Sequence, residues 1–117
     1  IYDCCLFFNE FELLNIRLHE LDAVVDKFLI VESDCTHAGQ RKPVWLAEKK
    51  HLFRKWGDKL TVVTAALSGE TAAEREQSQR QWIWRALQEM WIKDDDYVLM
   101  SDVDEIPHRD AVPHALE

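Results

Sequence analysis

The chain has 117 residues, 47% of them hydrophobic and only three glycine and three proline, which favours one ordered globular domain and excludes a low-complexity chain. Its formal net charge is −8, from 22 acidic and 14 basic side chains. Such a chain repels a phosphate backbone unless basic residues cluster on one face, and no cluster stands out, so nucleic acid is a poor partner. An acidic domain can still bind a nucleotide diphosphate when a divalent cation neutralises part of the charge on both sides.

No membrane segment is evident in the chain. No stretch approaches the ~20 consecutive apolar residues that a membrane-spanning helix needs, and the opening residues are not those of a signal peptide. We therefore expect any anchor or targeting segment to lie outside these residues, and we interpret residues 1–117 as one partial domain of a longer protein. The cysteines Cys4, Cys5 and Cys35 have neither a disulfide pattern nor zinc-type spacing, and Cys4 and Cys5 are predicted to be buried on opposite faces of a strand.

The first part of the chain predicts a strand, a helix and a second strand. Residues 2–8 are mostly apolar, as in a buried strand. Asn9 and Glu12 form a capping-box pattern for a helix that ends near Asp26. Four apolar residues recur along this helix at helical spacing: Leu14, Leu18, Leu21 and Val25. The uninterrupted apolar run 28–31 predicts a strand covered on both faces, as in a parallel sheet.

A loop from Cys35 to Pro43 leads into the next predicted elements. Residues 45–55 predict a helix that stops near Gly57, and residues 60–63 predict a third strand.

The longest predicted helix opens with a second capping-box pattern. Thr71 and Glu74 form this pattern, and the helix is expected to continue to about Lys93. Its apolar face is expected to hold five residues: Ile83, Trp84, Leu87, Met90 and Trp91. Residues 97–100 then predict a fourth strand, which Pro107 should end. Alternating strands and helices with apolar strands predict an α/β fold, a three-layer sandwich with a mainly parallel sheet.

The acidic pair Asp102 and Asp104 is the first candidate site. In open α/β sheets ligands bind beyond the carboxyl ends of the strands, and this pair follows the fourth strand directly. Residues two apart in an extended segment project to the same side, so both carboxylates can meet one hard cation, Mg²⁺ or Mn²⁺. The alternative is a solvated acidic loop, which is our interpretation of Asp94 to Asp96 at the amino end of that strand.

Other candidate side chains follow the second strand or lie on the long helix. Glu32 ends the second strand and could accept a hydrogen bond from a nucleobase or a ribose, or serve as a helix-capping or surface acid. Arg80 could reach a nucleotide or phosphate, or belong to a solvated helix face. His37 and His108 follow the second and fourth strands and are further candidates to approach a substrate.

Three blocks of the sequence, which together with the segments between them cover nearly the whole chain, resemble glycosyltransferase family 17. The blocks are Tyr2 to Leu21, Phe28 to Pro43, and the run from Val98 to Pro107 that contains Ser101-Asp102-Val103-Asp104. The resemblance implies a GT-A-like (Rossmann-like) fold that is incomplete in this chain. It also implies an inverting, metal-dependent enzyme that transfers N-acetylglucosamine from UDP-GlcNAc in β1,4 linkage to a mannose of an N-glycan or glycoprotein.

The resemblance assigns roles to residues. Asp102 and Asp104 would hold Mn²⁺ or Mg²⁺, and Ser101 would join them in binding the UDP-sugar donor. Glu32 and Arg80 would lie near the nucleotide. An inverting transfer needs a carboxylate base, which we expect outside these residues. Glu105 is the candidate within the chain, although a role supporting the loop is favoured. A eukaryotic member would lie on the lumenal side of the Golgi membrane, and a bacterial or viral one in the cytoplasm.

Two other functions are compatible with the sequence to different degrees. A noncatalytic nucleotide-sugar or carbohydrate-binding module derived from the same fold would keep the acidic pair and lack the base. A phosphoryl-transfer enzyme with an Asp nucleophile would carry its Asp-x-Asp after the first strand, whereas here the motif follows the fourth.

Overall fold

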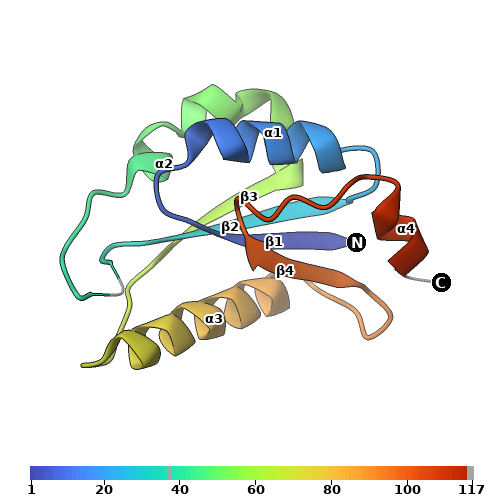
Figure 1. Ribbon diagram of the computed structural model, residues 1–117. Coiled ribbons are helices and arrows are strands. Elements are labelled where there is room, and N and C mark those ends of the chain that lie inside the picture. Colours follow the sequence, from blue (N-terminus) through green and yellow to red (C-terminus); the bar gives the residue numbers. More distant parts are fainter. Residues whose placement is uncertain (37, 116–117) are drawn as a thin grey trace.

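Four parallel strands form the middle layer of the computed structural model, which describes residues 1–36 and 38–115 (Figure 1). The strands are β1 (Tyr2–Phe7), β2 (Lys27–Ser33), β3 (Leu60–Ala65) and β4 (Val98–Asp102). Their order across the sheet is β3-β2-β1-β4. This arrangement confirms the predicted α/β fold with a parallel sheet.

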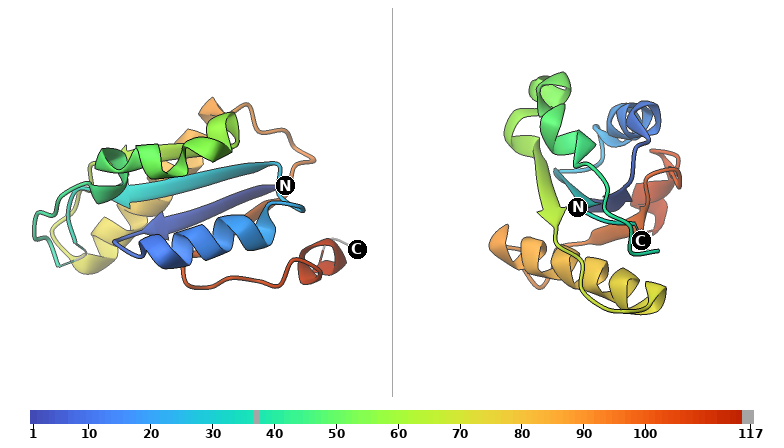
Figure 2. Two further views of the ribbon diagram at one scale, coloured as in Figure 1. Left: turned by 90° about the horizontal axis from the view of Figure 1, so that it is seen from above. Right: turned by 90° about the vertical axis from the view of Figure 1, so that its left-hand side faces the viewer.

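Helices make the two outer layers. They are α1 (Phe11–Leu21), α2 (Trp45–Glu48), the 3₁₀ helix η1 (Lys50–Lys59), α3 (Ala72–Glu89) and α4 (Ala111–Ala115). In the described part of the chain, none of them is long and apolar enough to cross a membrane. The helix α1 and the α2–η1 segment lie side by side above the sheet, and α3 lies below it (Figure 1, Figure 2). The predicted three-layer sandwich is therefore present.

The strands bury apolar side chains on both faces, as their uninterrupted apolar runs predict. The buried residues of β1 and β2 form two groups: Cys5, Phe7, Phe28 and Ile30 on the side of α1, and Cys4, Leu29 and Val31 on the side of α3. Cys4 and Cys5 thus lie on opposite faces, and both are free thiols. Burial raises the pKa of the Cys4 thiol to about 12, so this thiol is a core residue without a reactive thiolate at neutral pH.

The start of α1 differs from its prediction. Asn9 and Glu12 do not form a capping box, since the N-cap residue is Glu10 and no side chain caps the helix. The Glu10 carboxylate instead accepts the backbone N–H groups of the two preceding residues, at 3.0 and 3.1 Å. The helix ends at Leu21, before the predicted end near Asp26. Local side-chain hydrogen bonding has thus replaced the expected cap.

The predicted helix over residues 45–55 is divided. The α-helix α2 ends at Glu48, and the chain continues as the 3₁₀ helix η1. Within η1 the backbone departs from helical geometry at Phe53, with φ −111°, and at Gly57, with φ 51°. The left-handed φ at Gly57 favours glycine and interrupts the helical geometry within η1, at the position where the sequence predicts the helix to stop.

The segment around η1 carries several exposed basic residues, although the net charge of the whole chain is negative. Its exposed basic residues are Lys49, Lys50, Arg54 and Lys55. The Nζ atom of Lys49 lies 5.2 Å from the ring centroid of Phe11, and that of Lys55 lies 4.8 Å from the centroid of Trp56. These two side chains therefore cover aromatic rings at the edge of the core.

The second capping box is confirmed in its Thr71 half, whereas the Glu74 carboxylate bonds the residue before the N-cap. The Thr71 hydroxyl accepts the N–H of Glu74 at 3.1 Å, and the Glu74 carboxylate accepts the N–H of Glu70 at 3.1 Å. The far end of α3 differs from its prediction, because Trp91 adopts a left-handed φ of 62° and the helix ends at Glu89.

The apolar face of α3 is narrower than predicted. Ile83 and Leu87 are buried against the sheet, and Met90 packs beside them. Trp84 and Trp91 are 57% and 87% exposed. The prediction that these two tryptophans widen the buried face was wrong, because only the stripe that includes Ile83 and Leu87 faces the sheet.

The strand order reverses between β1 and β4. The strands β1, β2 and β3 follow one another in one direction, whereas β4 lies on the other side of β1. The carboxyl ends of all four strands point to the left in Figure 1. In open α/β sheets, ligands bind at the carboxyl edge where the order reverses.

Candidate functional site

A cleft lies at this point of the sheet. Its volume is about 430 Å³, which is in the range of small-molecule sites. The ends of β1 and β4, the loop after β2 and α3 all contribute to its walls. Its acidic residues are Glu10, Asp102 and Asp104, and its uncharged polar residues include Ser33, Thr36 and Gln79. The cleft therefore combines carboxylates with hydrogen-bonding groups where the topology predicts a ligand.

Asp102 and Asp104 line this cleft together. Asp102 is the last residue of β4, and Asp104 follows in a turn. Val103 between them is buried in the core on the side of α1. Both aspartates are exposed, and neither carboxylate has a hydrogen-bond or ion-pair partner among the described residues. The sequence prediction thus located two carboxylates that are free to meet a ligand.

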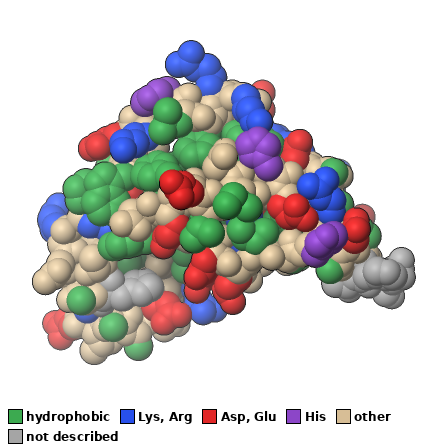
Figure 3. Space-filling model, turned by 45° about the horizontal axis from the view of Figure 1, so that its top comes forward, with side chains coloured by type: hydrophobic (Ala, Val, Ile, Leu, Met, Phe, Trp, Pro, Cys, Tyr) green, Lys and Arg blue, Asp and Glu red, His purple; other side chains and the backbone are tan. Residues whose placement is uncertain are grey.

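Any cation at this site would find few protein ligands. Among residues 1–36 and 38–115 no group of three or more His, Cys, Asp or Glu side chains could hold a metal ion. Glu10, the third acid of the cleft, already accepts two backbone N–H groups. Acidic side chains nonetheless gather among hydrophobic ones on one face of the molecule (Figure 3). Two free carboxylates suit a cation that takes its remaining ligands from phosphate oxygens and water.

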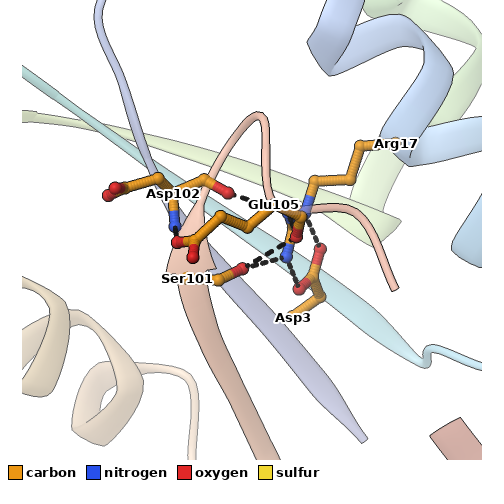
Figure 4. A network of polar contacts seen from close by, with 5 residues as sticks. All are labelled: Asp3, Arg17, Ser101, Asp102 and Glu105. Carbon is orange, nitrogen blue, oxygen red and sulfur yellow. Dashed lines mark hydrogen bonds and ion pairs between the residues drawn. The ribbon is translucent and has the colours of Figure 1, made fainter.

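Arg17 of α1 supports the turn that carries the acidic pair (Figure 4). Arg17 and Asp3 are both fully buried, and two hydrogen bonds of 2.7 Å join the guanidinium to the carboxylate. The same guanidinium donates to the Ser101 hydroxyl at 2.7 Å. It also donates to the carbonyl oxygens of Asp102 and Glu105, at 3.0 and 2.8 Å. One buried cation therefore contacts the amino-terminal part of β1, the carboxyl end of β4 and the turn.

The charge of Arg17 is maintained by Asp3. Burial alone lowers the pKa of Arg17, but the hydrogen bonds and the negative charge of Asp3 outweigh this effect and raise the pKa above its usual value. Arg17 is therefore charged throughout the physiological pH range.

Glu105 completes the turn. Its N–H donates to the Asp102 carbonyl oxygen at 3.0 Å, and its carboxylate accepts the Asp102 N–H at 2.9 Å. These bonds give Glu105 the loop-supporting role favoured from the sequence. Its candidacy as a general base stays a prediction.

Glu32 lies behind the cleft rather than on its surface. Its side chain is fully buried, one carboxylate oxygen accepts from Lys42 Nζ at 3.0 Å, and the other accepts from Leu46 N–H at 2.9 Å. Lys42 also donates to the carbonyl oxygens of Ser33 and Pro43, both at 2.9 Å. In this structure Glu32 anchors the loop after β2, and contact between Glu32 and a nucleotide stays a prediction.

Arg80 lies close to the acidic turn. It is exposed, forms an ion pair with Glu76 at 3.2 Å and lines a hollow of about 150 Å³ together with Ser101, Asp102 and Glu105. The structure thus brings together four of the predicted site residues, although their binding roles stay predictions. His108 is exposed and its ring lies 3.7 Å from the Asp110 carboxylate, and His37 lies outside the described residues.

Sequence reasoning missed Asp3 and Arg17, although the sequence contained a signal for them. Asp3 interrupts an apolar strand, and Arg17 falls on the apolar stripe of its helix between Leu14 and Leu21. Charged residues are almost never fully buried unless they are paired, so two opposite charges at core positions predict a buried ion pair. The loop residue Cys35 also lines the cleft without having been predicted.

The chain belongs to glycosyltransferase family 17, whose family model matches residues 1–115. This match confirms the resemblance that the sequence blocks indicate. A 40-residue stretch, 34% of the chain, is 45% identical to beta-1,4-mannosyl-glycoprotein 4-beta-N-acetylglucosaminyltransferase of Homo sapiens and of Rattus norvegicus. This stretch covers only 8% and 7% of the lengths of these two relatives. No solved structure matches the chain.

Proposed function

We propose that this chain binds the donor of a metal-dependent inverting glycosyltransferase, and that the donor is UDP-N-acetylglucosamine. In this proposal the sugar is transferred in β1,4 linkage to a mannose of a glycan. Membership of glycosyltransferase family 17 supports the reaction class. The names of the two relatives support the sugar and the acceptor.

The observation that carries the proposal is the position of the acidic pair. Asp102 and Asp104 line a cleft at the reversal of strand order, and their carboxylates have no partner in the described part of the chain. Two exposed carboxylates repel each other and repel a diphosphate unless a cation lies between them. A divalent cation balances the charge of the two carboxylates and would keep coordination positions for the oxygens of a nucleotide diphosphate, whereas the diphosphate without a cation would be repelled.

The residues present fit Mn²⁺ or Mg²⁺. Asp102 and Asp104 would provide hard oxygen ligands, and the donor diphosphate and water would provide the others. When bound, such a cation stabilises the negative charge that develops on a departing diphosphate. The protein side chains orient the donor and shield it from water. Glu105 supports the turn in this proposal, since its carboxylate already accepts a hydrogen bond from Asp102.

Other parts of the cleft suit the remainder of the nucleotide. Phe8 at the rim is 43% exposed, and its ring offers a surface on which a nucleobase can stack. Ser33 at the end of β2 and Thr36 on the loop that follows it provide hydroxyl groups. Hydrogen bonds from these groups would orient the ribose and the base.

The proposal is tested by measuring UDP-N-acetylglucosamine binding by calorimetry with and without Mn²⁺. We expect binding that requires Mn²⁺ and that weakens by about tenfold or more in Asp104→Ala, equivalent to ~1.4 kcal/mol or more. Asp95→Ala is the matched control, because Asp95 is an exposed aspartate at the opposite end of β4. It should bind like the parent protein.

The outcomes separate the parts of the proposal. Affinity that is independent of both Mn²⁺ and Asp104 would overturn the metal site. Equal weakening by Asp95→Ala would show a general charge effect instead of a specific site. Equal affinity for UDP-glucose or UDP alone would remove the assignment of N-acetylglucosamine while retaining a nucleotide site.

A further inference from the structure

We propose that Arg17 is the positioning residue of the acidic turn, and that it orients Asp102 and Asp104 without contacting the ligand. This inference rests on the proposed function for its consequence in binding. The geometry that supports it is independent of any ligand.

All five N–H donors of the Arg17 guanidinium are used. Two bind the Asp3 carboxylate, one binds the Ser101 hydroxyl, and two bind the carbonyl oxygens of Asp102 and Glu105. The two carbonyls belong to the first and last residues of the turn, which a hydrogen bond of 3.0 Å from Glu105 N–H to the Asp102 oxygen also closes. Arg17 therefore fixes both ends of the segment that contains Asp104.

The orientation of Asp102 agrees with this role. Figure 4 shows that the Asp102 carbonyl points toward the guanidinium while the Asp102 carboxylate points away from it. Arg17 thus binds the backbone of the acidic residue and leaves its charged group available. An arginine that paired directly with the Asp102 carboxylate would instead neutralise it.

Asp3 compensates the positive charge of Arg17, which would otherwise repel a cation bound at the acidic turn. The Asp3 carboxylate pairs with Arg17 and is fully buried with it, so the pair adds no net charge beneath the acidic turn. The remaining donors of Arg17 form charge-assisted hydrogen bonds with neutral oxygens, and such bonds are stronger than those from a neutral donor. Lysine cannot reproduce this arrangement, because it has three donors on one atom instead of five in a planar fork.

The test uses Arg17→Lys, with Arg109→Lys as the matched control. Arg109 also joins the segment after β4 to α1, through an exposed ion pair with Glu20 at 3.2 Å. Hydrogen exchange of the Asp102 and Glu105 amides is measured by NMR without ligand, with the amides of β2 as a measure of global stability. Calorimetry in parallel gives the affinity for UDP with Mn²⁺.

In Arg17→Lys we expect the two turn amides to exchange at least about tenfold faster while β2 stays protected. Affinity for UDP with Mn²⁺ should fall by about 10- to 100-fold, the usual effect of removing a group that orients metal ligands. Arg109→Lys should change neither quantity. A turn that stays fully protected in Arg17→Lys, or unchanged affinity beside faster exchange, would overturn the positioning role.

Two further measurements still test the proposal if Arg17→Lys does not fold or if the parent protein does not bind UDP. If Arg17→Lys fails to fold, Ser101→Ala removes one acceptor of Arg17 and leaves the Asp3 pair intact, and it should cause smaller changes in the same direction. No change in Ser101→Ala would then overturn the proposal. If the parent protein does not bind UDP with Mn²⁺, the proposed function fails, whereas the exchange data still decide whether Arg17 orders the turn.

Discussion

Replacing Lys42 by methionine should destabilise the protein strongly, although Lys42 is a charged residue on a loop. Its ammonium group and the Glu32 carboxylate lie 3.0 Å apart with side-chain exposures of 3% and 0%. Solvent therefore screens this pair little. The substitution leaves the Glu32 carboxylate buried without a cation, and removing one partner of a buried pair costs about 3–5 kcal/mol. A loss of this size is a large part of the ~5–15 kcal/mol stability of a typical domain.

The assay is urea unfolding followed by tryptophan fluorescence. Lys59→Met is the matched control, because Lys59 pairs with Asp22 at 2.6 Å in an exposed position, with side-chain exposures of 29% and 50%. Exposed pairs contribute about 0–1 kcal/mol, so this variant should unfold nearly like the parent. The double variant Glu32→Gln with Lys42→Met removes both charges and should recover about 2 kcal/mol or more of the loss. Strictly additive effects, or a Lys42→Met cost no larger than that of Lys59→Met, would refute the reasoning.

Two further predictions concern the thiols and the helix caps. Cys35 lines the cleft, while Cys4 and Cys5 are fully buried and burial raises the pKa of both thiols, so a thiol reagent should label Cys35 first. UDP with Mn²⁺ should slow the labelling of Cys35, which mass spectrometry measures. Equally rapid labelling of all three cysteines would contradict the burial of Cys4 and Cys5. Thr71→Ala removes a cap that accepts from Glu74 N–H and should cost about 1 kcal/mol in chemical unfolding. Asn9→Ala serves as its control, since Asn9 caps no helix, and a similar cost for both would contradict the cap assignment.

The strands and their burial could be predicted from the sequence because they depend on local composition. Runs such as Phe28 to Val31 are apolar on both faces, and only a strand between two helical layers buries all of them. The position of Asp102 could be predicted for the same reason, because Asp102 comes at the end of the apolar run that forms β4. Helix ends were less predictable, because the left-handed φ of Trp91 lies before the predicted end of α3 near Lys93, and because Glu10 and not Asn9 is the N-cap residue of α1.

The partners of buried charges could not be read from sequence patterns. Glu32 was expected at the nucleotide because it ends a strand, but Lys42 folds back and pairs with it. Arg17 binds groups 84 to 88 residues later in the chain. Such pairings depend on which loops meet in three dimensions, whereas periodicity and capping patterns describe only neighbouring residues.

The distance in sequence between Arg17 and the acidic turn has a consequence for folding. During synthesis the segments that form β1, β2 and β3 are made before the segment that forms β4. The hydrogen bonds of Arg17 to Ser101, Asp102 and Glu105 can form only when β4 has added to the edge of β1. The acidic turn is thus ordered in the same event that adds β4 to the sheet. A ligand that needs this ordered turn binds only the state in which β4 is paired with β1, and at 100 times its dissociation constant it would add about 2.7 kcal/mol to the stability.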